Sequence, residues 1–273
     1  MAVLAHISDL HLRPPGVLTL GTIDADRYTA AAIDAVNRRH PDVDAVIVSG
    51  DVADLGEDDA YTRAAMLLLR FSAPVIVMPG NHDATGNLRE AFAAFPGLGA
   101  EPVPGKACHV HRIADVTVVA LDTSVDDIAN STHHGEVGAA QLEWLGNALE
   151  GAGPTVIAMH HPPFDVGIGF MDDIGLTDRD AFAAVLARHR NVVRIVCGHV
   201  HRTIVGDVAG VPTMAIPGVA HQVMLALEEG APVGLVMEPP AYAVHTVTAH
   251  GAVSHVGYVN EFDAAVRVGS EAA

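Results

Sequence analysis

Residues 75–83 read Val75-Ile76-Val77-Met78-Pro79-Gly80-Asn81-His82-Asp83. The first four residues are apolar and three of them are β-branched, which predicts a short strand buried on both faces. Proline and glycine then end the strand, and an amide, an imidazole and a carboxylate follow directly after the turn. A buried strand that ends in a polar turn is typical of an open α/β sheet, where ligands gather outside the carboxyl ends of the strands.

The same buried-strand pattern recurs through the first two thirds of the chain. Such runs are found at Val3–Ile7, Ala45–Ser49, Val116–Leu121, Thr155–Met159 and Val192–Cys197. Segments with helical spacing and acidic or capping residues at their starts lie between strands, at Asp26–Arg39, Asp58–Arg70, Ala139–Leu149 and Asp178–Arg190. This alternation predicts a layered α/β fold.

The composition of the 273-residue chain is that of a globular protein, because half of its residues are apolar and only 18% are charged. The 33 acidic and 15 basic residues give a formal charge of -18, and no basic stripe is present, so we expect no nucleic-acid polymer as a partner. The first residues do not read as a secretory peptide, and no apolar run has the length of a membrane helix. We therefore expect a cytoplasmic protein without a membrane partner.

Five polar motifs each follow directly after one of the predicted strands. They are Asp9-Leu10-His11, Gly50-Asp51, Gly80-Asn81-His82-Asp83, His160-His161-Pro162 and Gly198-His199-Val200-His201. Any one of these motifs alone is equally well read as a polar turn. Five in order, each at the end of a strand, favour one shared site at the carboxyl edge of a sheet.

The donor atoms in these motifs are imidazole nitrogens, carboxylate oxygens and one amide oxygen, a set suited to zinc, iron, manganese or cobalt. There are more donors than one cation can use. Two cations that share a carboxylate are the economical solution, because the negative charge offsets their mutual repulsion. The sequence therefore predicts two divalent or mixed-valence metal ions per chain.

The set Asp9-x-His11, Gly50-Asp51-x-x-Asp54, Gly80-Asn81-His82-Asp83, His160 and Gly198-His199-x-His201 resembles the calcineurin-like metallophosphoesterase superfamily, over residues 3 to about 202. A second set resembles the bacterial class III cyclic nucleotide phosphodiesterases and glycerophosphodiesterases, and it carries the resemblance to about residue 225. It consists of Leu121-Asp122-Thr123-Ser124, Met171-Asp172-x-Ile174-Gly175 and Pro217-Gly218-x-x-His221-Gln222-Val223.

The resemblance implies a four-layer αββα sandwich and a division of the metal ligands. One cation would take Asp9, His11, Asp51 and His201, and the other would take Asp51, Asn81, His160 and His199, so that Asp51 is the bridge. It also implies substrate-facing side chains around the metals. His82 would contact the substrate, as a donor to a phosphoryl oxygen or as the acid that protonates the leaving alkoxide, and Asp83 would orient it.

Four residues around this site keep two interpretations each. Asp54 either supports a metal-binding imidazole or is a carboxylate in a surface turn. His221 either contacts the substrate or is a packed core histidine, and His133 with His134 either borders the pocket or lies in an ordinary loop.

The activity implied is hydrolysis of small phosphodiesters by a metal-activated hydroxide, with 3′,5′-cyclic nucleotides favoured over glycerophosphodiesters. Only Arg13 and Arg202 lie near the motifs to grip a doubly charged phosphate, which disfavours a phosphomonoesterase or protein phosphatase. A binding module without activity is a third reading, and such modules usually lack some of the ligands.

After His201 the pattern changes to strands without helices, at Thr203–Val208, Val211–Ile216, Val233–Met237, Tyr242–Thr248 and Ala252–Tyr258. The last three strands are expected to extend the second sheet or to form a cap, which divides the chain into a catalytic domain at 1–225 and a C-terminal β extension at 226–273. The apolar strand at 233–237 is a candidate interface of a homo-oligomer. The small polar tail at 263–273 is expected to be loosely ordered.

Overall fold

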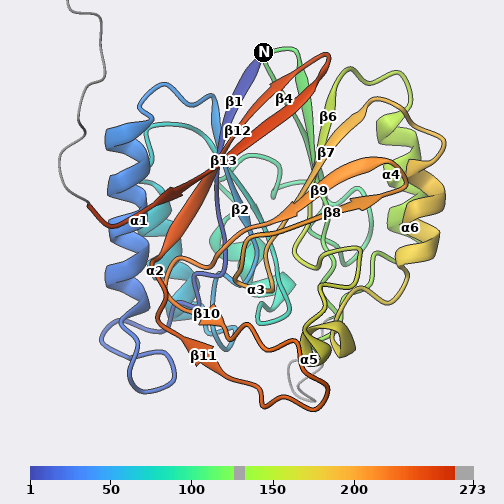
Figure 1. Ribbon diagram of the computed structural model, residues 1–273. Helices are drawn as coiled ribbons and strands as arrows, with labels where there is room; N and C mark the ends of the chain where they lie inside the picture. The colour runs from blue at the N-terminus through green and yellow to red at the C-terminus, as the bar shows by residue number, and fades with distance from the viewer. Residues whose placement is uncertain (126–132, 262–273) are drawn as a thin grey trace, which may run out of the picture.

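Two β-sheets lie face to face in the centre of the molecule, and helices cover both outer faces (Figure 1). The computed structural model describes residues 1–125 and 133–261, so the predicted tail at 263–273 lies outside the described residues. The four layers confirm the predicted αββα sandwich.

The first sheet has the strand order β13-β12-β1-β2-β3. Its strands are β1 (Ala2–Ile7), β2 (Ala45–Ser49), β3 (Val75–Met78), β12 (Ala241–Thr248) and β13 (Gly251–Tyr258). β1, β2 and β3 are parallel, and their outer face is covered by α1 (Ala25–Arg39), α2 (Asp58–Leu68) and the short α3 (Thr85–Ala91). Because side chains alternate along a strand, Ala5 and Ile7 of β1 pack on the helices while Leu4 packs between the sheets.

The second sheet has the order β4-β5-β6-β7-β9-β8. Its strands are β4 (His109–Ile113), β5 (Val116–Ala120), β6 (Thr155–Ala158), β7 (Val192–Cys197), β8 (Ile204–Val208) and β9 (Val211–Ala215). Its outer face packs on α4 (Ala139–Leu149) and α6 (Arg179–Leu186), with α5 (Gly169–Asp173) at one end (Figure 1). The strand β4 and the helices α3 and α5 have short or irregular apolar patterns, and the sequence did not indicate them.

The C-terminal strands correct the sequence-based expectation. β12 and β13 do not extend the second sheet, because β12 pairs antiparallel with β1 at the edge of the first sheet, from Ala2 opposite Val247 to His6 opposite Ala243. Only Leu235–Val236 of the predicted strand at 233–237 is extended, as β11, and it pairs with β10 (Gln222–Val223). The division at residue 225 stays a prediction.

Pairing of β1 with β2 and β3 places the carboxyl ends of these strands at one edge, and β5, β6 and β7 of the second sheet end at the same side. In the residues described, no helix combines the length and the apolar character needed to cross a membrane.

Candidate metal centre

The polar motifs lie in tight turns directly after the strands, and the backbone of three of these turns is strained. Eight non-glycine residues of the described chain have a positive φ, and five of them are predicted ligands. They are Asp9, His11, Asp51, His199 and His201, with φ between 46° and 70°. Left-handed backbone costs a non-glycine residue about 1–2 kcal/mol, so packing and hydrogen bonds elsewhere in the fold stabilise these turns.

Glycine lets the turns approach one another closely. A Cβ atom on Gly80 would lie 2.2 Å from Oδ1 of Asp51 and 2.8 Å from the His160 ring. No side chain larger than hydrogen fits there, so Gly80 brings the loop after β3 against the loop after β2. The predicted bridging carboxylate and the predicted amide ligand Asn81 are neighbours for this reason.

The first predicted ligand set forms a buried cluster. Nitrogen and oxygen atoms of Asp9, His11, Asp51 and His201 lie within 4.8 Å of one another. Nε2 of His11 is 3.4 Å from Oδ2 of Asp51 and 3.1 Å from Nε2 of His201, and Nε2 of His201 is 3.4 Å from Oδ1 of Asp9. The structure therefore brings all four side chains together.

The second predicted set lies on the other oxygen of the same carboxylate. Nε2 of His160 is 3.3 Å from Oδ1 of Asp51 and 3.0 Å from Oδ1 of Asn81. Nδ1 of His199 is 2.8 Å from that same Asn81 oxygen. Asp51 thus stands between the two clusters, with one carboxylate oxygen toward each.

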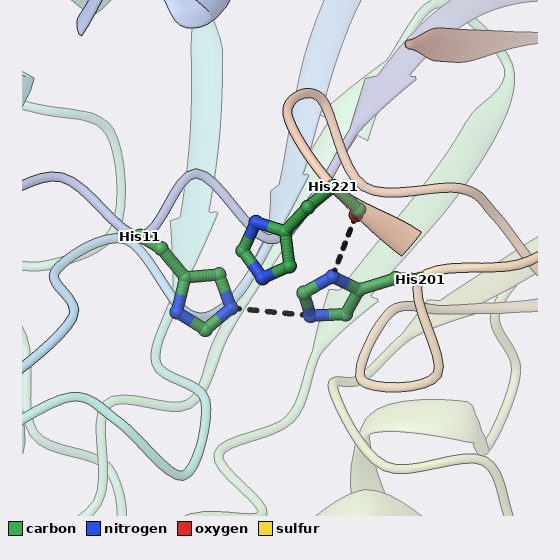
Figure 2. A group of neighbouring side chains, drawn as sticks. All are labelled: His11, His201 and His221. Atoms are coloured by element: carbon green, nitrogen blue, oxygen red, sulfur yellow. Dashed lines mark hydrogen bonds between the residues drawn. The ribbon is translucent and has the colours of Figure 1, made fainter. Parts of the chain in front are cut away.

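Hydrogen bonds on the outer side fix which nitrogen faces inward in three of the four ligand imidazoles. Nδ1 of His11 faces Oδ1 of Asp54 at 3.1 Å, and Nδ1 of His201 faces the His221 carbonyl oxygen at 2.9 Å (Figure 2). Nδ1 of His160 faces the Ser49 carbonyl oxygen at 2.7 Å. Carbonyl and carboxylate oxygens only accept here, so each Nδ1 carries the proton and each Nε2 of a neutral ring offers a lone pair. Asp54 therefore contacts a predicted ligand, as expected for a supporting carboxylate.

The inner surface of the cluster is consequently rich in acceptors and poor in donors. Lone pairs of three Nε2 atoms, the oxygens of Asp51 and the amide oxygen of Asn81 point to the same small space. Oδ2 of Asp9 is also buried without a hydrogen-bond partner. Buried acceptors of this kind are costly unless a cation or proton lies between them, so the residues present fit a pair of divalent cations.

The charges of the cluster are strongly coupled. Burial alone would raise the pKa of Asp51, but the neighbouring His160 and His82 hold that pKa well below its usual value. Burial opposes protonation of His160 as well, yet Asp51 outweighs it and raises the pKa of His160 to about 9. Burial raises the pKa of Asp9 to about 6. A proton on an imidazole thus offsets part of the buried negative charge when no cation does.

The amide group of Asn81 is oriented by His133, for which the sequence allows two interpretations. Its Nδ2 donates to Nδ1 of His133 at 3.0 Å, which directs Oδ1 toward His160 and His199. His133 also lies against His82, with ring centroids 5.1 Å apart, whereas its half-buried neighbour His134 lies beyond the cleft lining. His133 is therefore part of the site rather than of an ordinary loop.

Asp83 corrects another expectation. Its carboxylate does not orient His82, because it accepts from the backbone N–H groups of Val52, Ala53 and Gly80 and from the Tyr61 hydroxyl, at 2.8–3.1 Å. Nδ1 of His82 instead faces the Asp54 carbonyl oxygen at 2.8 Å. Asp83 holds the Asp51 turn in place, and the backbone donors that it uses leave no pattern in the sequence.

A cleft of about 190 Å³ opens above the cluster, and two kinds of side chain line it. His82, His133 and His221 are among its polar residues, and the ring of His221 lies 5.1 Å from the His11 ring and 4.7 Å from the His201 ring (Figure 2). Burial, with His201 and His11 nearby, lowers the pKa of His221 to about 2, so this ring is neutral. The apolar residues of the lining form what is called the apolar wall below, and they are Leu20, Phe170, Met171, Ile174, Val223 and Leu235.

Comparison with known proteins identifies the chain. The family model described as calcineurin-like phosphoesterase matches residues 2–203. The chain belongs to this family. The match covers all five turns of the metal centre, so the resemblance inferred from the motifs is confirmed.

Relatives within this family divide between two substrate classes. The chain is 39% identical to a probable cyclic nucleotide phosphodiesterase of Rhodopseudomonas palustris, with 91% of this chain and 89% of the relative covered. It is 31% identical to the cAMP/cGMP dual specificity phosphodiesterase of Mycobacterium tuberculosis, with 93% and 81% covered. It is also 31% identical to the glycerophosphodiester phosphodiesterase GpdQ of Enterobacter lignolyticus, with 89% and 86% covered.

A solved structure shares the architecture. The crystal structure of a dimetal phosphatase from Danio rerio superimposes with a TM-score of 0.65 at 17% identity, over 93% of this chain and 98% of that one. This likeness concerns the fold.

Proposed function

We propose that the protein is a dinuclear metal-dependent phosphodiesterase that hydrolyses small phosphodiesters, with 3′,5′-cyclic nucleotides as the favoured substrates. The observation that carries the proposal is the convergence of buried acceptor atoms on both oxygens of Asp51. An acceptor-lined cluster at the floor of a cleft is suited to cation-assisted hydrolysis rather than to structural packing.

In this proposal Asp51 bridges two cations. Asp9, His11 and His201 complete the first set of ligands, and Asn81, His160 and His199 complete the second. When bound, such a pair lowers the pKa of water toward neutrality and neutralises charge on phosphoryl oxygens. Iron, manganese, zinc and cobalt all suit these donors.

The chain's own residues position the substrate and move the proton. With Nδ1 of His82 engaged by the Asp54 carbonyl, its other nitrogen faces the cleft and serves the phosphoryl oxygen or the leaving alkoxide. His221 also lines the cleft, next to His201, and contacts the substrate from the edge of the first ligand set. Asp54 and His133 keep the ligands His11 and Asn81 in their orientations.

The charge of the described cleft lining favours diesters over monoesters. Among the described residues that line the cleft there is no lysine or arginine. Arg13 bonds Glu57 at 2.8 Å and lies 3.5 Å from Asp54, while Arg202 donates to the Val223 carbonyl at 2.6 Å and reaches Glu238 at 3.1 Å. A dianionic monoester would find no arginine clamp here, whereas a singly charged diester has less need of one.

The apolar wall favours a nucleotide over a glycerol ester. A nucleobase presents a flat, weakly hydrated face, which packs well against Phe170, Met171 and Ile174. Glycerol carries hydroxyl groups that lose water against such a wall without gaining a partner. Some relatives similar to this chain are named as cyclic nucleotide phosphodiesterases and others as glycerophosphodiester phosphodiesterases, so glycerophosphodiesters remain the second candidate substrate.

A metal-controlled substrate panel tests the proposal. The purified protein, freed of metal and reloaded with Mn²⁺, is assayed on 3′,5′-cyclic AMP, a glycerophosphodiester and an aryl phosphomonoester. We expect turnover that needs the metal, with the highest kcat/KM on the cyclic nucleotide. Turnover that survives chelation, or a clear preference for the monoester, would contradict the proposal.

The proposal extends to assembly and location. We propose a homo-oligomer that pairs through the exposed apolar segment around β11, where Val233, Leu235 and Met237 are 43–58% accessible to solvent. Light scattering at several concentrations tests it, and a monomer throughout would rule it out. The cytoplasm remains the location expected from the sequence.

A further inference from the structure

A chain of polar side chains runs along the inner face of the first sheet, from β13 over β12 and β1 to β2. Nδ1 of His245 lies 2.7 Å from the hydroxyl of Ser254, and Nε2 of His245 lies 3.2 Å from Nδ1 of His6. Nε2 of His6 lies 2.7 Å from the hydroxyl of Ser49, which donates to the hydroxyl of Ser8 at 2.7 Å. All but Ser254 are fully buried in a layer that is otherwise packed with apolar side chains.

The hydrogen bonds of this chain all run in one direction. Because the Ser49 hydroxyl donates to Ser8, it must accept from Nε2 of His6. A neutral ring has a single N–H group, so Nδ1 of His6 accepts from His245, and Nδ1 of His245 then accepts from Ser254. Burial and the nearby His245 keep the pKa of His6 well below its ordinary value, and burial with Arg194 lowers the pKa of His245 to about 3.

The inner end of the chain reaches the turns of the metal centre. Ser8 and Ser49 are followed by the strained turns that carry Asp9 and Asp51. The Ser49 carbonyl oxygen is also the acceptor for Nδ1 of His160, at 2.7 Å. Space around Ser8 is tight, because a Cβ atom on Gly198 would lie 2.0 Å from its hydroxyl oxygen. Rotation of either serine would therefore disturb the turns on both sides.

We propose that His6 and His245 are positioning residues of the metal centre. Their hydrogen bonds, which all run in one direction, hold Ser8 and Ser49 in place. Through the Ser49 carbonyl they also hold the ring of His160. The inference rests on the proposed ligand role of His160. Neither histidine contacts the cleft, so they act on cation binding and not on substrate.

Glutamine and leucine at position 6 separate this role from simple packing. Glutamine offers one donor amide and one acceptor oxygen, so it replaces both hydrogen bonds of the His6 ring. Leucine fills similar space with neither bond and leaves Ser49 and His245 unsatisfied. A role in packing alone predicts that leucine is tolerated at least as well as glutamine.

The test measures Mn²⁺ binding to the metal-free protein by calorimetry, without substrate. We expect His6→Leu to weaken the Mn²⁺ affinity of one of the two sites about tenfold, which is the lower end of the range for residues that hydrogen-bond to metal ligands. The Mn²⁺ affinity of His6→Gln should stay within about twofold of wild type. His109→Leu is the matched control, because within the described residues this buried histidine bonds only His111 and the Val77 carbonyl. Its Mn²⁺ affinity should not change.

If His6→Leu does not fold, the same test is made at Ser254, the half-buried residue at the outer end of the chain of hydrogen bonds. Ser254→Ala removes the hydroxyl that donates to His245, and Ser254→Thr keeps it. The alanine variant should then bind Mn²⁺ more weakly than the threonine variant. Equal affinities for the leucine and glutamine variants, or for the alanine and threonine variants, would overturn the inference. A wild-type protein that binds no Mn²⁺ would contradict the proposed function itself, and this inference with it.

Discussion

Nε2 of His11 lies 3.1 Å from Nε2 of His201, and the Nδ1 atom of each ring is already committed to an oxygen acceptor. Two neutral rings in this arrangement point lone pairs at each other, which is repulsive unless something positive lies between them or beside them. Burial lowers the pKa of His11, but the carboxylates of Asp54 and Asp51 outweigh it and raise this pKa, which favours a proton on the ring when no cation is bound. A cation that takes the position of the proton satisfies both nitrogens at once.

Removing the charge of the bridging carboxylate should abolish activity. Asp51→Asn keeps the shape of the side chain but loses the negative charge that holds two cations together, so we expect phosphodiester turnover to fall at least about 1,000-fold, or about 4 kcal/mol in the barrier. Steady-state kinetics together with metal analysis measure it. Asp59→Asn, on the exposed surface of α2, is the control and should behave as wild type. Full metal-dependent turnover by Asp51→Asn would refute the assignment.

Loss of the carboxylate behind His11 should weaken metal binding without touching the substrate. Asp54→Ala removes the acceptor of the His11 Nδ1 proton, so the ring can turn away from the cluster. Supporting residues of this kind contribute about 10–100-fold to metal affinity, and we expect a loss in that range. Competition with a chelator measures the affinity. A variant that needs no more Mn²⁺ than wild type for half-maximal activity would show that Asp54 is only a turn residue.

The apolar wall should govern which substrate binds. Phe170 is 41% accessible to solvent and lines the cleft, so Phe170→Ser removes apolar surface that a base would cover. Loss of about 1.4 kcal/mol of apolar contact corresponds to an increase of about tenfold in the KM for a cyclic nucleotide. The KM for a glycerophosphodiester, which has no base, should change less than about twofold. Equal changes for both substrates would argue against a base on this wall.

Acid should destabilise the fold through buried neutral histidines. Burial and His111 lower the pKa of His109 from 6.5 to about 4. Between these two pH values the unfolded chain binds a proton at this residue that the folded chain does not. The stability that is present above pH 6.5 is therefore lost as the pH falls toward 4. The loss from this residue is up to about 1.4 kcal/mol per pH unit. Urea unfolding of the metal-free protein between pH 7 and 4.5 measures the slope.

The variant His109→Gln should flatten this pH dependence, since glutamine does not titrate. His250→Gln removes an exposed histidine and should leave the slope as in wild type. An unchanged slope in His109→Gln would mean that His109 is not a source of the acid sensitivity.

Much of the fold and most of the site could be predicted from the sequence, because both depend on local patterns. The buried strands at 45–49 and 75–78 have continuous apolar runs, and the motifs that follow them include donors that a metal centre needs. The ligands from the last turn, His199 and His201, are also visible because they stand next to a glycine at a strand end.

The parts that escaped prediction depend on contacts between distant segments. β12 pairs with β1 across more than 230 residues, and no local pattern selects the first sheet over the second. The carboxylate of Asp83 accepts hydrogen bonds from backbone N–H groups. Almost every residue has such a group, so no sequence pattern marks these partners. His6 and Ser49 lie in strands whose sequences look like ordinary apolar runs, so their chain to His245 becomes visible only when β12 pairs with β1.

The central claim is that one carboxylate, that of Asp51, is shared by two cations. Crystals of the protein loaded with Mn²⁺, measured at the manganese absorption edge, test it most directly through an anomalous difference map. We predict two peaks, one beside each oxygen of Asp51, about 3.5–4 Å apart, which is the spacing of two-metal hydrolases. A single peak at full occupancy, or peaks away from Asp51, would contradict the account.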